Sequence, residues 1–235
     1  MVKVDVIVPV FHNGPTLKEI FLRLKSCCEV LAWDYRILFV DDACPEGSGK
    51  VLREIAGRSS RVQVERHTKN LGQHAAVMTG LRASRAGYAV VIDADLQDPP
   101  EALPLLWKKI TEGFAVVFAA RRGQYESNLR MRSSRLFKGL LHRLTGVPRD
   151  AGYFLMMNSE AREALTKGEW EFPFLPAMIG CLKLSVASVP VARERRKAGV
   201  SAYSAFKRLK VAARVFWAVT EYKMRQLGLL KKGRT

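Results

Sequence analysis

The sequence predicts an α/β domain built on a mainly parallel β-sheet that carries helices on both faces. Short runs rich in β-branched and aromatic residues alternate with longer segments whose apolar residues recur at helical spacing. Strands joined by helices in this way pair in parallel and are covered on both sides. Acidic residues stand directly behind two of the apolar runs, at 41–42 and 93–98. Sheets of this class bind ligands beyond the carboxyl ends of their strands, so both acidic clusters fall in the expected crevice.

The first strand-and-helix unit begins with a β-branched run at 4–10. The polar turn "FHNGP" follows, and then an amphipathic helix at 16–31 with Thr16 as its predicted N-cap. Three further units repeat this order. We expect their strands at 35–40, 62–66 and 88–93, and their helices at 50–56, 74–86 and 100–113. A fifth strand at 114–120 ends the regular alternation.

The chain becomes strongly basic after residue 120. Residues 1–120 hold 15 basic and 14 acidic side chains, whereas the remainder holds 24 and 8, so almost all of the formal charge of +17 lies in the second half. A charge of this sign favours anionic partners, namely nucleic acid, acidic lipid or phosphorylated substrates. In this half we expect an apolar helical stripe at 136–144, strands at 152–157 and 182–192, a helix at 159–166 and a basic amphipathic tail from 203.

Cysteine usage and hydropathy indicate a reducing compartment and no bilayer-spanning helix. The four cysteines form no C-x-x-C pair, and no apolar leader with a small-residue cleavage site opens the sequence. No stretch approaches the roughly 18 uninterrupted apolar residues that cross a bilayer. We therefore expect a cytoplasmic protein.

The segment "VVIDADLQDPPE" at 90–101 predicts a divalent-metal site. Asp93 and Asp95 project toward one cavity only if the strand ends between them, and the amide oxygen of Gln97 completes an all-oxygen donor set. Mg²⁺ and Mn²⁺ prefer such ligands and keep coordination positions open for phosphate oxygens. The alternative is that these acids cap the next helix, which is the interpretation we favour for Asp98.

A second acidic pair, Asp41 and Asp42, ends the second predicted strand. These carboxylates suit hydrogen bonds to a nucleobase or a ribose in the crevice, and the alternative is that they shape the turn that follows. In either role they belong to the same edge of the sheet as the predicted metal site.

Five segments of the chain carry a resemblance to a known family. In order they are "VIVPVFHNGPTL", "FVDDACPEGSGKVL", "NLGQHAAVMTGLRAS", "VVIDADLQDPPE" and "VPVARERRKAGVSAYS". They resemble the ordered motifs of family 2 glycosyltransferases over roughly residues 4–206, and most closely the dolichyl- and polyprenyl-phosphate sugar transferases. The resemblance implies the single-domain nucleotide-diphosphosugar transferase fold, glycosyltransferase fold A. It further implies a catalytic domain at 1–202, with a nucleotide-sugar half to about 120 and an acceptor half at 121–202, and then a basic amphipathic C-terminal helix or tail at 203–235.

The resemblance also implies roles for individual residues. The nucleotide-sugar site would comprise Pro9, Val10, Phe11, Asp41, Asp42, Gly72, Asp93 and Ala94. The metal, Mg²⁺ or Mn²⁺, would be held by Asp93, Asp95 and Gln97. The diphosphate and the acceptor would be bound by Arg121, Arg193, Arg196, Ser201 and Tyr203. Arginine suits this task because its planar guanidinium holds phosphate oxygens through two hydrogen bonds.

The activity implied is an inverting transfer of a sugar from a nucleotide-diphosphate sugar to a polyprenyl phosphate, such as dolichyl or undecaprenyl phosphate. Asp95, Arg193 and Arg196 would carry the reaction by stabilising charge on the departing diphosphate. The chain departs from the "D-x-G-D-F-R-L" pattern of these relatives, since Tyr153 and Leu155 replace an acid and an arginine. A glycan hydroxyl in cell-surface polysaccharide synthesis is therefore the alternative acceptor, and Asp150 would then act as the general base.

The basic second half bears on the partners. Helices that combine apolar stripes with lysine and arginine bind anionic membrane surfaces, and the alternative is that both stripes pack on the core. We expect a peripheral protein on the inner face of the cell membrane, with a membrane-anchoring partner or a homo-oligomer left open. A rival class, nucleic-acid binding without catalysis, leaves the metal cluster unexplained. The second half also has few stacking aromatics interleaved with its basic residues, so we expect no nucleic acid as partner.

Overall fold

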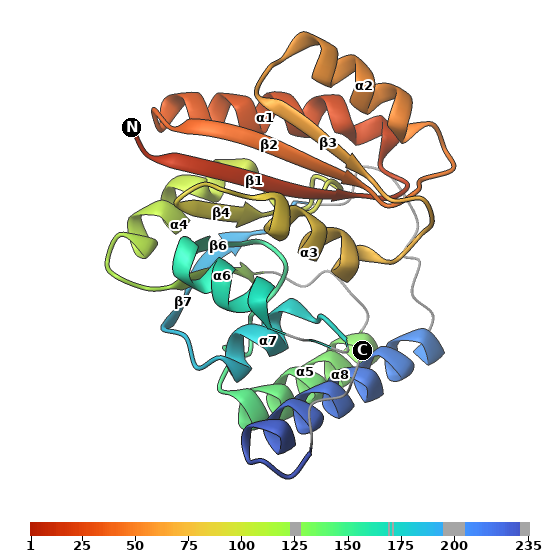
Figure 1. Ribbon diagram of the computed structural model, residues 1–235, viewed down its shortest axis with the longest axis vertical. Coiled ribbons are helices and arrows are strands. Elements are labelled where there is room, and N and C mark those ends of the chain that lie inside the picture. The colour runs from red at the N-terminus through yellow and green to blue at the C-terminus, as the bar shows by residue number, and fades with distance from the viewer. Residues whose placement is uncertain (123–127, 169, 171, 195–204, 231–235) are drawn as a thin grey trace.

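A seven-stranded sheet forms the centre of the molecule (Figure 1). The computed structural model describes residues 1–122, 128–168, 170, 172–194 and 205–230. The strands are β1 (Lys3–Val10), β2 (Asp34–Asp41), β3 (Val62–Arg66), β4 (Tyr88–Val91), β5 (Val116–Arg122), β6 (Leu155–Asn158) and β7 (Val186–Ala192). They lie in the order β3-β2-β1-β4-β6-β5-β7, which confirms the predicted mainly parallel sheet.

One strand, β6, runs against both of its neighbours. Val91, the last residue of β4, lies opposite Leu155, the first residue of β6, and Phe118 of β5 lies opposite the same leucine. The chain therefore re-enters the sheet at the carboxyl end of β4. From there β6 runs back along β4 in the opposite direction. As a result, β6 from the second half of the sequence lies between β4 and β5 in one sheet.

Helices cover both faces of the sheet, as predicted. The helices on one face are α1 (Leu17–Val30), α2 (Ser48–Arg58) and α4 (Leu103–Ile110), and those on the other are α3 (Gln73–Ala83), α5 (Asn128–Thr145), α6 (Ser159–Lys167), α7 (Leu175–Cys181) and α8 (Ala205–Gln226). The alternation of side chains along β1 builds both cores, because Val6 and Val8 join the first cluster whereas Ile7 joins the second. The short helix α7, which begins at a Leu-Pro pair, was not predicted.

The predicted C-terminal helix is α8, and it packs beside α5 and α7 at one end of the molecule (Figure 1). The rings of Phe137 and Phe216 meet with centroids 5.4 Å apart, and Val215 and Val219 of α8 are buried. The predicted boundary between residues 202 and 203 lies outside the described residues. Within the described part of the chain, none of the helices is both long enough and apolar enough to span a bilayer.

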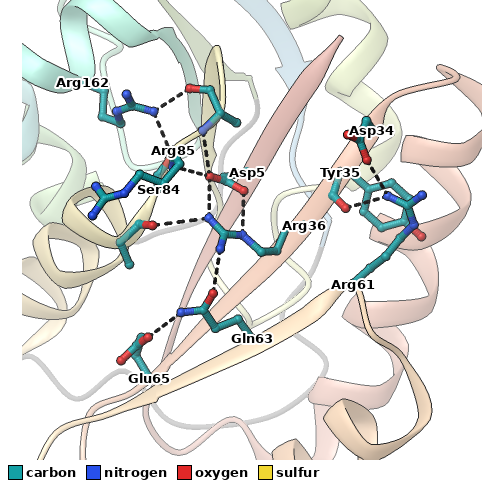
Figure 2. A network of polar contacts seen from close by, with 12 residues as sticks. Asp5, Asp34, Tyr35, Arg36, Arg61, Gln63, Glu65, Ser84, Arg85 and Arg162 are labelled. Carbon is teal, nitrogen blue, oxygen red and sulfur yellow. Dashed lines mark hydrogen bonds and ion pairs between the residues drawn. The ribbon is translucent and has the colours of Figure 1, made fainter. Parts of the chain in front are cut away.

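The amino-terminal edge of the sheet is fastened by a buried carboxylate (Figure 2). Asp5 of β1 forms two hydrogen bonds of 3.0 Å with the guanidinium of Arg36 on β2. Its Oδ2 also accepts hydrogen bonds from the backbone N–H groups of Arg85 and Ala86, which precede β4. Arg162 of α6 reaches the same turn through the carbonyl of Ala86. This network joins two strands, a turn and a helix at the edge opposite to the predicted site.

Candidate active site at the carboxyl ends of the strands

The predicted nucleotide residues of β1 lie where three parallel strands end. Val10 is paired with Asp41 of β2, and Val91 of β4 is paired with Ile7, so the segments that follow these strands leave the sheet at one edge. Pro9 and Val10 are buried, whereas Phe11 is 38% exposed just beyond the strand. The strand β4 ends at Val91, before both Asp93 and Asp95 and not between them as expected, so both acids lie in the turn that follows the strand.

The acidic segment after β4 is fixed by hydrogen bonds from three directions. Gln73 at the start of α3 donates from Nε2 to Oδ1 of Asp93 at 2.6 Å. The hydroxyl of Thr16 donates to the carbonyl of Ala94 at 2.6 Å, and the backbone N–H of Gln97 donates to Oδ1 of Asp95 at 3.0 Å. The turn places Leu96 at a φ of 59°. The segment is therefore held by α3, by the start of α1 and by its own backbone.

These residues suit a magnesium or manganese ion. Asp93, Asp95 and Gln97 are all partly exposed, and they offer carboxylate and amide oxygens. Across the described residues, no group of three or more His, Cys, Asp or Glu side chains forms a complete metal cage. An incomplete oxygen set is what a site needs when substrate phosphates supply the remaining ligands, because Mg²⁺ usually binds through one or two carboxylates, waters and phosphate oxygens.

Asp98 and Arg193 come together at this turn. Asp98 is buried, and Nε of Arg193 lies 3.8 Å from its Oδ1. The backbone of the next residue, Glu194, donates to the carbonyl of Gln97 at 2.9 Å. Our interpretation of Asp98 as a helix cap is wrong, since Pro99 occupies the cap position of the following 3₁₀ turn, Pro100–Ala102, and that cap has no side-chain hydrogen bond. Thr16 does occupy the N-cap position of α1, but its hydroxyl donates to carbonyl groups instead of capping the helix.

An arginine on α1 anchors the segment that follows β7. Arg23 donates to both carboxylate oxygens of Glu101 at 2.9 and 2.6 Å, and to Glu194 at 2.7 Å. The hydrogen bond with Glu101 is the largest cause that raises the pKa of Arg23 above its ordinary value. This ion-pair cluster holds the backbone next to Arg193 against the acidic turn.

The two acids that end β2 have protein partners. Asp41 is fully buried, accepts a hydrogen bond of 2.9 Å from the backbone N–H of Cys44, and lies 3.4 Å from Nε of Arg66. Asp42 accepts hydrogen bonds of 2.8 Å from the backbone N–H groups of Leu71 and Gly72. The structure thus places both acids and Gly72 at the predicted edge, where their contacts also shape the loops. Their roles toward a nucleotide stay predictions.

The predicted acceptor residues are only partly placed. Arg121 lies near the carboxyl end of β5, paired with Val191 of β7. Asp150 accepts a hydrogen bond of 2.8 Å from the hydroxyl of Ser188 on the edge strand β7, so its described contact is not with the acidic turn. Arg196, Ser201 and Tyr203 lie outside the described residues.

A cluster of aromatic rings adjoins α3 and contains the tyrosine that replaces an acid of the family pattern. Tyr153 hydrogen-bonds Nδ1 of His74 and accepts at its hydroxyl from the backbone N–H of Leu175 at 3.3 Å. Phe172 and Phe174 pack edge-on against the imidazole. Burial lowers the pKa of His74 to about 4, so the imidazole is neutral at pH 7.

Sequence reasoning missed two residues of the site, Gln73 and Thr16. Both contact the acidic segment through side chains, yet they lie 20 and 78 positions away from their partners in the sequence. The only sequence signal was the polar start of each helix, which we assigned to capping in the case of Thr16.

Comparison with known proteins identifies the family. Residues 5–172 match the family model described as glycosyl transferase family 2. The undecaprenyl-phosphate 4-deoxy-4-formamido-L-arabinose transferase of Edwardsiella ictaluri (strain 93-146) is 31% identical over 229 residues, which cover 96% of this chain and 70% of that protein. The transferase of the same name from Enterobacter sp. (strain 638) is 30% identical over 231 residues, with 97% and 70% covered.

Solved structures agree with the predicted fold. Mannosyl-3-phosphoglycerate synthase from Rubrobacter xylanophilus superposes with a TM-score of 0.65 at 17% identity, covering 100% of this chain and 77% of that one. Glucosyl-3-phosphoglycerate synthase from Mycobacterium tuberculosis, solved with Mn²⁺, uridine-diphosphate-glucose and phosphoglyceric acid, gives 0.64 at 19% identity, with 99% and 82% covered. At these identities the likeness concerns the fold, and it confirms glycosyltransferase fold A. On the family match over more than half of its length, the chain belongs to glycosyl transferase family 2.

Proposed function

We propose that this protein transfers a sugar, with inversion, from a nucleotide-diphosphate sugar to a polyprenyl phosphate. The observation that carries the proposal is the hydrogen-bonded segment Asp93–Asp98 at the carboxyl edge of the sheet, which Arg193 meets at Asp98. The relatives named above act on undecaprenyl phosphate, and the Mycobacterium tuberculosis neighbour was solved with Mn²⁺ and a nucleotide sugar, which supports this acceptor and this donor.

The proposed mechanism depends on charge stabilisation at the departing nucleoside diphosphate. Asp93, Asp95 and Gln97 would hold Mg²⁺ or Mn²⁺, which supplies positive charge to the diphosphate when bound. Arg193 would add its guanidinium from the other side of the turn. Its backbone is fixed by the hydrogen bond from Glu194 to Gln97, so the guanidinium needs little reorganisation when the leaving group departs.

A phosphate acceptor is compatible with the absence of an acid at position 153. A lipid phosphate is already anionic and attacks the anomeric carbon without a general base, whereas a sugar hydroxyl must lose its proton. Tyr153 is engaged with His74, and Asp150 with Ser188. Neither arrangement supplies a carboxylate beside the acidic turn, so the glycan-hydroxyl acceptor remains the weaker alternative.

We further propose that the protein works on the inner face of the cell membrane. Leu136 and Leu140 of α5 are 76% and 44% exposed, and Trp217 of α8 is 66% exposed. Lys210 and Arg214, on the same helix as Trp217, are exposed as well. Apolar and basic side chains together favour an anionic lipid surface, where a polyprenyl phosphate would be found.

The test is a transfer assay with a panel of radiolabelled nucleotide sugars, undecaprenyl phosphate and membrane extract as a source of glycan, followed by partition into organic solvent. We expect labelled lipid with Mg²⁺ or Mn²⁺, and a loss of at least about 100-fold for Asp95→Asn, because a metal-bound diphosphate is the centre of the reaction. Asp34→Asn is the matched control, since Asp34 is an exposed acid at the start of β2 that pairs with Arg61.

Two results would count against the proposal. Turnover by Asp95→Asn at the rate of the unaltered protein would contradict the role of the metal. Label that enters water-soluble glycan and never the organic phase would show that the acceptor is a glycan hydroxyl and not a lipid phosphate.

A further inference from the structure

We infer that Gln73 is a positioning residue for the metal site, because it fixes the carboxylate of Asp93 in the orientation in which the carboxylate binds the ion. This inference rests on the proposed function, since it takes Asp93 to be a metal ligand. It adds a residue from α3, which belongs to neither acidic cluster.

The contact itself is short and well directed. Nε2 of Gln73 lies 2.6 Å from Oδ1 of Asp93, and both side chains are partly buried. The amide N–H of Gln73 donates to this oxygen, which the carboxyl group of Asp93 offers as an acceptor. A hydrogen bond to one carboxylate oxygen restricts rotation of the group and so lowers the entropy lost when an ion binds.

The start of α3 is itself held rigidly in place. Gln73 is the first residue of the helix, and Gly72 before it adopts a φ of 91°, which a side chain would strain. The backbone N–H groups of Leu71 and Gly72 both donate to Asp42 at 2.8 Å. The carboxylate of Asp42 therefore sets where the helix begins.

A histidine extends this support to the next turns of α3. Nδ1 of His67 lies 2.7 Å from Oδ1 of Asp42, and Nε2 of the same ring lies 2.9 Å from the hydroxyl of Thr79. The side chains of His67 and Asp42 are 9% and 3% exposed. The imidazole thus joins the end of β2 to the body of α3, and the helix presents Gln73 to Asp93 at a fixed distance. Asp42 then acts on the site through α3.

Side chains that hydrogen-bond to metal ligands have measurable effects on metal binding. Removing a group that orients a ligand typically costs about 10–100-fold in metal affinity or activity. For Gln73→Met, which keeps the length of the side chain and removes the donor, we expect Mn²⁺ affinity in the presence of uridine or guanosine diphosphate to fall about 10-fold.

The experiment measures free Mn²⁺ by electron paramagnetic resonance in titrations of the full chain with the diphosphate present. Diphosphate binding in EDTA and the melting temperature are measured alongside. Gln63→Met is the matched control, because Gln63 also hydrogen-bonds through its amide, to Glu65 and Arg36, but belongs to the network of Figure 2. We expect Gln73→Met alone to weaken Mn²⁺ binding, with the metal-free diphosphate affinity unchanged.

The outcomes separate this inference from the proposed function. If the unaltered protein binds no Mn²⁺ in the presence of uridine diphosphate or of guanosine diphosphate, the metal role of Asp93 fails and this inference fails with it. If the unaltered protein binds Mn²⁺ and Gln73→Met binds it equally well, only the positioning role is overturned. A loss of diphosphate affinity in EDTA would instead make Gln73 a nucleotide contact. Should Gln73→Met melt early, Gln73→Ala replaces it, because alanine favours the helix and also lacks the donor.

Discussion

Asp5 shows how a single buried charge can be stabilised at the edge of a sheet. Burial opposes its ionisation, but hydrogen bonds from the Arg36 guanidinium and from the backbone N–H groups of Arg85 and Ala86 outweigh burial and lower the pKa of the carboxyl group (Figure 2). A group whose pKa is lower in the folded state stabilises that state above its ordinary pKa. The contribution is lost as the pH falls through the folded value.

We therefore expect the difference in stability between the unaltered protein and Asp5→Asn to depend on pH. At pH 7 the variant should lose about 1.5–3 kcal/mol of unfolding free energy, the usual effect of removing a charged hydrogen-bond partner. The difference should shrink as the pH falls below about 3.9, the ordinary carboxyl pKa, because Asp5 of the unfolded chain then takes up a proton, and it should keep shrinking until the pH passes the lowered pKa of the native carboxyl group. Urea unfolding at pH 7 and at pH 3 measures both values.

Asp34→Asn is the control for this prediction. Asp34 pairs with Arg61 at 3.0 Å, and both side chains are more than 40% exposed. Exposed pairs contribute about 0–1 kcal/mol, so the control should unfold almost as the unaltered protein does at both pH values. Equal losses for the two variants would mean that the Asp5 network adds nothing beyond a surface pair.

At the residue scale, the sequence indicated where the carboxylates lie but not what holds them. Asp93, Asp95 and Asp41 follow apolar runs, and the ends of parallel strands meet at one edge, so their placement could be predicted. Gln73 and Thr16 could not be assigned, because a side-chain hydrogen bond between distant segments leaves no local pattern. The same holds for Asp98, because its partner Arg193 lies far along the sequence.

Among the elements, α3 lies so close to β1 that one position must be glycine. A Cβ built on Gly80 would stand 2.4 Å from Cγ2 of Ile7, which is buried in the strand. The close approach sets the distance between α3 and the sheet. It therefore helps to set the position of the first turn of α3 relative to the acidic segment.

We expect Gly80→Ala to destabilise the protein by about 1–3 kcal/mol, the usual cost of overpacking a filled core. Gly57→Ala in α2 is the matched control, since no atom lies within 4 Å of a Cβ built there. Alanine at an unhindered helical position should stabilise by about 0.5–1 kcal/mol. Opposite shifts in the denaturation midpoint are expected, and a stabilised Gly80→Ala would show that the helix moves away at no cost.

The order of strands and helices could be predicted from periodicity, because each element is amphipathic or apolar over its full length. The direction of β6 and the helix α7 could not. Strand direction depends on where the chain re-enters the sheet, and α7 is only seven residues long, which is too short for a helical period to stand out.

On the scale of the whole molecule, the apolar stripe at 136–144 divides between two environments. Leu141 is 3% exposed and packs in the core, whereas Leu136 is 76% exposed. The packing interpretation thus holds for Leu141, whereas binding of the exposed side of the stripe to a membrane stays a prediction. The excess of basic residues in this half makes an anionic partner the favoured one.

We expect the protein to float with vesicles that contain anionic phospholipid, less so as salt is raised, because exposed charges are screened. The double variant Leu140→Ser, Trp217→Ser should bind at least about tenfold more weakly. It lacks the free energy gained when two large apolar side chains transfer from water into lipid. Leu22→Ser is the control, as Leu22 on α1 is 60% exposed on the other layer of helices. No flotation of the unaltered protein at low salt would remove the membrane proposal.

The antiparallel strand β6 has a mechanical consequence. Because β6 is hydrogen-bonded to β4 on one side and to β5 on the other, segments from both halves of the sequence lie in one continuous sheet. A hinge motion within this sheet would break the hydrogen bonds between β6 and its neighbours, so the fold opposes opening and closing of two separate lobes. The direction from which an incoming nucleophile meets the sugar is then built into the fold, which suits a reaction that must always give the same anomer.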